Sequence, residues 1–88
     1  MNEHYSVENI ANLSMAYFLI GERIQKGIKA LVLLGTTYEE AEQMFQISID
    51  SSPKKSNPDW LKEITKQKDR YLKAFQWALY LNEQGKLS

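Results

Sequence analysis

The sequence contains no cysteine and only one histidine, His4, among its 88 residues. Disulfides and thiolate metal sites are therefore excluded, and a single histidine cannot build a zinc site. No cysteine nucleophile is available, and the four scattered glycines form no phosphate-binding loop. Glu39, Glu40 and Glu42 lie too close along one segment to face each other across a cleft. We therefore expect no catalysis, no cofactor and no metal ion.

Long apolar runs are also missing. The longest, MAYFLI and ALVLL, are far shorter than the ~20 residues of a membrane span. The amino terminus, MNEHYSVENI, has an early acid and no apolar core, unlike a signal peptide. The sequence therefore predicts a cytoplasmic chain that does not contact the membrane. Its composition, leaning toward Lys, Ile and Asn, suggests a bacterium or a phage as the source.

The composition that remains is that of one globular domain. Hydrophobic residues make up 43% of the chain and charged residues 25%, which lies in the range of folded proteins. The length predicts a single domain over residues 1–88, with frayed ends at 1–5 and 86–88. The net charge of zero hides an asymmetry, because residues 1–53 hold seven acids and three bases whereas residues 54–88 hold four acids and eight bases. The positive half is suited to an anionic partner.

Apolar residues recur at helical spacing throughout, and no alternating strand pattern occurs. Residues 7–34 carry a stripe of apolar residues at intervals of three, four or seven positions: Ile10, Leu13, Tyr17, Ile20, Ile24, Leu31 and Leu34. Ser6 is the predicted N-cap of this helix, and Gly35 ends it. Gly21 and Gly27 are costly inside a helix, so the stripe fits either one long helix or two helices separated by a bend at one glycine.

Two further helices follow from cap chemistry. Either Thr36 with Glu39 or Thr37 with Glu40 opens a second, shorter helix by a capping box. Its predicted buried face consists of Tyr38, Ala41, Phe45 and Ile49. After the SSPKKSNP loop, Asn57 caps a third helix that has Pro58 at its first position and ends at Gly85. The sequence thus predicts an all-α antiparallel three-helix bundle, long–short–long, or four helices if the first one breaks.

Several apolar side chains lie off these buried faces. On a helical wheel, Met15, Leu19 and Leu33 point nearly opposite the first stripe, and Trp77 points away from Phe75. A helix that is apolar all round is typical of one with contacts on several sides. Bases and aromatics also share the outward arc of the third helix. The predicted partner-binding residues are Met15, Leu19, Leu33, Lys66, Arg70, Lys73, Trp77 and Tyr80.

The segment YEEAEQMFQISIDSSP, residues 38–53, resembles the second helix of a tetratricopeptide repeat. With KDRYLKAF in the third helix, the chain also resembles microtubule-interacting-and-transport domains, which are three-helix modules that bind short peptide motifs. The same segment is partly similar to a sigma-factor helix-turn-helix. However, Glu42 and Gln46 depart from that motif, and two prolines interrupt the place of its recognition helix.

These features predict a small non-catalytic protein-interaction module, a regulator or an inhibitor. It would bind another protein, or itself as a homodimer, through an apolar groove and a face centred on Trp77. The alternative is a nucleic-acid-binding accessory protein. It would use the bases Lys54, Lys55, Lys62, Lys66, Arg70 and Lys73.

Overall fold

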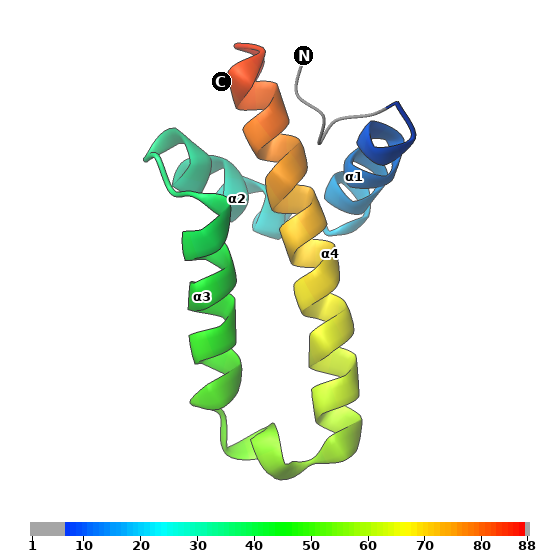
Figure 1. The fold of residues 1–88 in the computed structure, drawn as a ribbon, viewed down its shortest axis with the longest axis vertical. Helices are drawn as coiled ribbons and strands as arrows, with labels where there is room; N and C mark the ends of the chain where they lie inside the picture. Colours follow the sequence, from blue (N-terminus) through cyan, green and yellow to red (C-terminus); the bar gives the residue numbers. More distant parts are fainter. Residues whose placement is uncertain (1–6, 88) are drawn as a thin grey trace.

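The computed structural model describes residues 7–87, with side-chain surroundings described from Asn9 onward. Within this range the chain is all-helical and contains no strand (Figure 1). The elements, in chain order, are α1 (Val7–Leu19), α2 (Glu22–Leu33), α3 (Tyr38–Asp50), a short 3₁₀ helix η1 (Pro53–Ser56), and α4 (Pro58–Glu83). The all-α class is confirmed. An unbroken first helix is wrong, because the chain breaks between Leu19 and Glu22, as the four-helix alternative expected.

The break is made by Gly21. Its φ of 101° and ψ of 150° lie in a region that is accessible essentially only to glycine. The corner is then fixed by a hydrogen bond in which Gln25 Nε2 donates to the backbone oxygen of Tyr17 over 2.7 Å. Gly27, by contrast, lies inside α2 with open space around it. Of the two glycines, Gly21 alone marks a bend.

The predicted helix starts are confirmed where the structure describes them. At α3, the Thr37 hydroxyl accepts from the Glu40 amide over 3.1 Å, and the Glu40 carboxylate accepts from the Thr37 amide over 3.0 Å. This is a complete capping box. At α4, the Asn57 side chain accepts from the amides of Asp59 and Trp60, and Pro58 occupies the first position. The predicted N-cap Ser6 lies outside the described residues.

Two glycines end helices. Gly35 after α2 and Gly85 after α4 have φ values of 91° and 70°, the left-handed conformation that closes a helix C-terminus. Beyond Gly85, the amide of Lys86 donates to the Leu81 oxygen over 2.8 Å, and Leu87 is buried in the main core. Residues 86 and 87, expected to be frayed, therefore pack against the rest of the fold.

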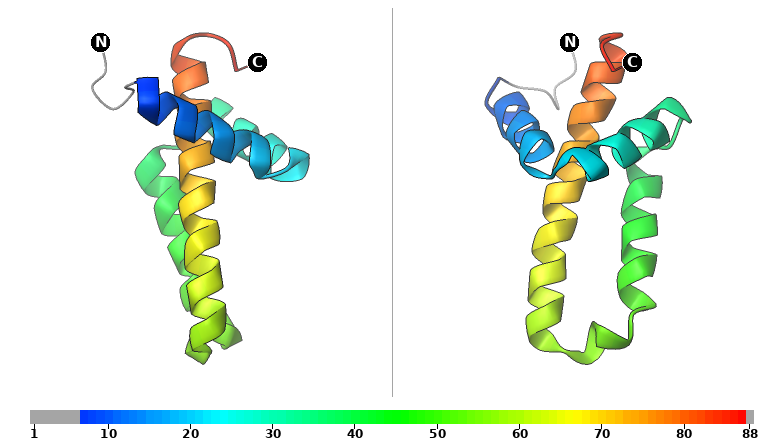
Figure 2. Two further views of the ribbon diagram at one scale, coloured as in Figure 1. Left: turned by 90° about the vertical axis from the view of Figure 1, so that its right-hand side faces the viewer. Right: turned by 180° about the vertical axis from the view of Figure 1, so that it is seen from behind.

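The long helix α4 is the central element of the fold and contacts every other helix. α3 runs antiparallel beside its N-terminal half, whereas α1 and α2 cross its C-terminal half on either side (Figures 1 and 2). Lys68 Nζ ties the hairpin by donating to Gln46 Oε1 over 2.9 Å. The Cα radius of gyration is 13.7 Å, above the roughly 12 Å of a compact domain of this length. The protruding α3–α4 hairpin accounts for this elongated shape, whose extents are 42 × 27 × 24 Å.

The core surrounds the C-terminal half of α4. Phe75, Ala74 and Ala78 of this helix have no exposed surface, and Ile28 of α2 is equally buried. The small alanine side chains leave room for crossing helices to approach closely, and Phe75 fills the space between them. The cluster also contains Val32, Ala41, Leu72 and Leu87. This core positions α1 and α2 against α4, and so fixes the surfaces between them.

Candidate functional site

The solvent face of α1 is apolar. Met15, Phe18 and Leu19 are 62%, 68% and 76% exposed, whereas Leu13 on the opposite face is buried. Residues 9–19 include no acid and no base. A helix that is apolar on its inner and outer faces is typical of a helix with contacts on both sides. The exposure of Met15 and Leu19 agrees with the sequence pattern.

The first of two adjoining hollows lies between α1 and α4. Asn12, Met15, Ala16 and Leu19 form one wall, and Arg70 and Lys73 of α4 form the other. The hollow has a volume of about 610 Å³ and is open to solvent. One wall is therefore uncharged and largely apolar, while the other is basic.

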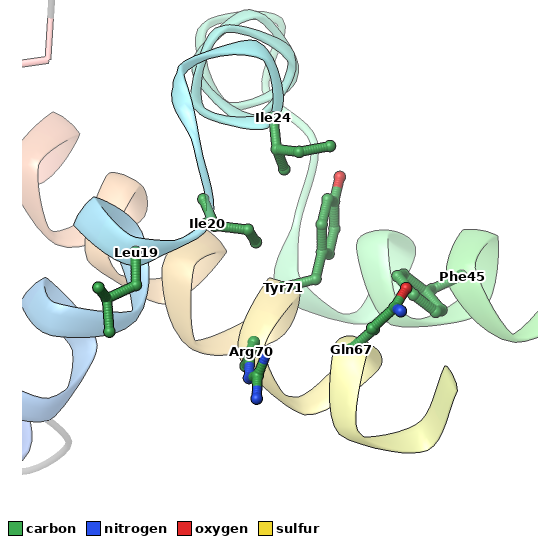
Figure 3. A pocket seen from close by; sticks show the side chains of 7 residues that line it. All are labelled: Leu19, Ile20, Ile24, Phe45, Gln67, Arg70 and Tyr71. Carbon is green, nitrogen blue, oxygen red and sulfur yellow. The ribbon is translucent and has the colours of Figure 1, made fainter. Parts of the chain in front are cut away.

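The second hollow, of about 280 Å³, lies by the corner between α1 and α2, and Figure 3 shows the side chains that line it. It is lined by side chains from all four α-helices: Leu19, Ile20, Ile24, Phe45, Gln67, Arg70 and Tyr71. Leu19 and Arg70 line both hollows. We name the combined surface the α1–α4 groove.

Tyr71 forms the floor of the second hollow. Its ring lies 5.4 Å from the ring of Phe45 and 6.4 Å from that of Phe75, centroid to centroid, so it joins the groove to the core. Figure 3 shows the Tyr71 side chain standing between Phe45 and Ile20, with Ile24 near its outer end. Burial raises the pKa of the Tyr71 phenol above its ordinary value. The group is therefore uncharged at neutral pH.

Four of the bases of α4, Lys62, Lys66, Arg70 and Lys73, are exposed along one side of the helix. Lys62, Lys66 and Arg70 follow one another at intervals of four residues, so they are neighbours on the helix surface. Among the side chains of residues 9–87, none is an ion-pair partner of these three, whereas Lys73 Nζ lies 3.0 Å from Asp69 Oδ2. Arg70 thus brings an unpaired guanidinium to the edge of the α1–α4 groove.

The other predicted binding residues lie elsewhere. Leu33 is exposed near the end of α2 but lines neither hollow of the groove. Trp77 and Tyr80 of α4 are partly buried, and their rings stack with centroids 5.4 Å apart. The Trp77 Nε1 atom is itself buried and has no hydrogen-bond partner among the described residues. Trp77 therefore belongs largely to the packing of the fold.

Some groove residues were not predicted. Ile20, Ile24 and Phe45 were assigned to buried faces, yet they line the second hollow, and Ile24 is 40% exposed. Phe18, which is exposed on the same face of α1 but lines neither hollow, was not singled out either. The sequence signal for it was the spacing of Met15, Phe18 and Leu19, which places three apolar residues on one face of a short helix.

Among the described residues, no cluster of three or more histidine, aspartate or glutamate side chains is arranged to hold a metal ion. None of the helices between residues 7 and 87 is both long and apolar enough to span a bilayer. No family model, curated protein or solved structure matches the chain. The resemblance to tetratricopeptide-repeat and microtubule-interacting-and-transport modules therefore stays a prediction.

Proposed function

We propose that this chain is a non-catalytic protein-interaction module that binds its partner along the α1–α4 groove. The observation that carries the proposal is the outer face of α1, where Met15, Phe18 and Leu19 are more than half exposed beside a hollow lined by α4. Exposed apolar surface next to a concavity is typical of a binding site. A partner segment that covered this face would remove the same surface from water.

The location of the exposed apolar residues supports this proposal. It argues against the alternative that a small fold has too few residues to cover its apolar side chains. Leu19 is shared by both hollows, and Met15 lines the first of them. The exposed residues thus flank a concave surface into which a partner's side chains would insert, giving both van der Waals contact and apolar burial. A module this small would act on its partner by occupying its surface, which suits a regulator or an inhibitor. A homodimer is one form that such binding would take.

The proposal is tested with a double variant, Met15→Gln with Leu19→Gln, and a matched control, Leu33→Gln. Leu33 is also exposed but lines neither hollow. Tagged proteins would be used for quantitative capture from the native lysate, and sedimentation velocity would report self-association. We expect the double variant to lose the partners or self-association of the wild type and the control to retain them. Identical capture and sedimentation for all three proteins would contradict the proposal.

A second candidate, nucleic-acid binding, is favoured by the unpaired row Lys62, Lys66 and Arg70. Binding through phosphates would weaken steeply with salt. If three phosphate contacts formed, the affinity for duplex DNA would fall roughly 40-fold between about 0.05 M and 0.2 M salt. Binding in an apolar groove would change little over that range. A filter-binding or anisotropy titration at the two salt concentrations separates the two candidates.

A further inference from the structure

The charge of the α1–α4 groove comes entirely from one wall. Among its lining residues, α1 contributes no charged side chain, and α4 contributes Arg70 and Lys73. Lys73 is paired with Asp69, so Arg70 is the lining cation without a carboxylate within the described residues. It lines both hollows, with apolar side chains on either side of it.

The spacing of the neighbouring bases is unfavourable for the helix itself. Lys62, Lys66 and Arg70 form like-charged pairs at intervals of four residues, which destabilise an isolated helix. Asp59 and Glu63 stand three residues before the two lysines and offset part of this repulsion, whereas no acid stands three or four residues before Arg70. No acid whose side chain is described, within residues 9–87, forms an ion pair with these three bases. An anionic group bound at Arg70 would relieve this repulsion. Arginine also presents a planar set of N–H donors that matches a carboxylate in a two-bond geometry.

We infer that the α1–α4 groove takes an acidic amphipathic segment of another protein. Apolar side chains of the segment occupy the two hollows, and a carboxylate between them pairs with the Arg70 guanidinium. This inference rests on the function proposed above and adds the chemistry of the partner to it. Because Leu19 and Arg70 are common to both hollows, the acid of the segment lies between two apolar positions.

The lining favours a peptide over a nucleic acid. Met15, Leu19, Ile20 and Ile24 are aliphatic or thioether side chains, which suit the apolar side chains of a peptide. Nucleobases bind by stacking on accessible aromatic rings. Of the aromatic rings that line the groove, those of Phe45 and Tyr71 pack against each other, and Tyr71 also packs against Phe75. The exposed ring of Phe18 lines neither hollow. A peptide uses both the apolar hollows and the cation, whereas phosphates use the cation alone.

The test is a selection from a displayed library of random peptides about 16 residues long, enough for roughly four helical turns. The library is selected in parallel against the wild type, Arg70→Glu, Leu33→Gln, and the Met15→Gln/Leu19→Gln double variant. On the wild type and on Leu33→Gln we expect enrichment of Asp or Glu within one helical turn of Leu, Ile or Phe. On Arg70→Glu the enriched charge should change to Lys or Arg.

The strongest wild-type peptide is then synthesised and titrated against each protein by fluorescence anisotropy. Arg70→Gln should weaken its binding about two- to fivefold, as expected for one ion pair of an exposed arginine. Changing the acid of the peptide to Gln should weaken binding to the wild type equally, with little further loss on Arg70→Gln. Leu33→Gln should bind with unchanged affinity.

Three outcomes would overturn the inference. If the same purely apolar peptides were enriched on the wild type and on Arg70→Glu, the partner segment would not be acidic, but the proposed function would still hold. If peptides were enriched equally on the wild type and the double variant, or if no peptide were enriched at all, both the acidic partner and the proposed function would be wrong. If a single-stranded oligonucleotide or a second copy of this chain bound in the groove, that molecule and not an acidic segment of another protein would be its ligand. Anisotropy with the oligonucleotide and sedimentation of the double variant detect these two cases.

Discussion

The helices α1 and α2 have nearly the same length, 13 and 12 residues, and both pack on the C-terminal half of α4, yet their solvent faces differ. The outer face of α2 carries Glu22, Arg23 and Lys26, with Lys26 Nζ 3.5 Å from Glu22 Oε1. The outer face of α1 carries Met15, Phe18 and Leu19. The apolar exceptions on α2 are Ile24, which is 40% exposed in its first turn, and Leu33 at its C-terminal end, which Leu34 follows as the C-cap.

This difference bears on the origin of the exposed apolar surface. If the small size of the domain were the cause, helices in equivalent positions would expose similar surfaces. Instead, α2 has an amphipathic pattern with a charged exterior, while residues 9–19 of α1 carry no charge at all. The uncharged exterior of residues 9–19 is therefore a property of that part of α1 and not of the fold. The binding role proposed for α1 would account for it.

The largest expected effects come from the inner faces of α1 and α2, which are similar in that both pack against α4. Leu13 of α1 and Ile28 of α2 are both almost fully buried. Leu13→Ala and Ile28→Ala should each lower the free energy of unfolding by about 2–5 kcal/mol, because each leaves a cavity. Urea unfolding followed by circular dichroism measures this. A near-neutral Leu13→Ala would mean that α1 docks weakly, and its exposed face would then reflect loose packing.

The next effect concerns the corner that separates the two helices. Gly21→Ala should lower the free energy of unfolding by about 1–3 kcal/mol, because alanine is strained at a φ of 101°. Gly27→Ala is the matched control. It lies inside α2 with open space around it, so alanine there should stabilise the protein by up to about 1 kcal/mol. Thermal unfolding of both variants tests the pair, and equal effects would contradict the assignment of the bend to Gly21.

The position of the bend at Gly21, and not at Gly27, could not be predicted from the sequence. Both lie inside one continuous apolar stripe, because Ile20 and Ile24 are four residues apart across the break. A bend at either position, or at neither, is compatible with that spacing. The hydrogen bond from Gln25 to the Tyr17 oxygen favours the corner at Gly21, but it exists only after the helices are placed. The choice between three and four helices was therefore not available from local patterns.

Local chemistry, by contrast, was predictable. The capping box at Thr37 and the Asn57–Pro58 start of α4 depend on residues within a few positions of each other, and both are confirmed. The groove depends on helix directions instead. Ile24 and Phe45 satisfy helical stripes, yet the splayed arrangement places them at the edge of a hollow. Sequence periodicity identifies an apolar face, but only the tertiary arrangement decides whether another helix covers it.

A smaller effect is expected at the start of α3, in the element that follows α2. Thr37→Ala should lower the free energy of unfolding by about 1 kcal/mol, because the hydroxyl satisfies the Glu40 amide. Thr37→Ser keeps the hydroxyl and should restore most of this loss. Chemical denaturation with the two variants measures the difference. If serine and alanine were equally destabilising, the capping hydrogen bond would not be the cause.

The smallest effect is expected where the two helices differ most, on the outer face of α1. Met15→Gln with Leu19→Gln gives α1 a polar exterior like that of α2, and should change the free energy of unfolding by no more than about 0.5 kcal/mol. The side chains removed are already in water, so little burial is lost. Leu13→Gln on the opposite face is the control, and it should destabilise the protein strongly because it buries an amide. Equilibrium urea unfolding distinguishes the two outcomes. A loss of several kcal/mol in the double variant would mean that these residues stabilise the isolated fold, and the apolar exterior of α1 would then no longer require a partner.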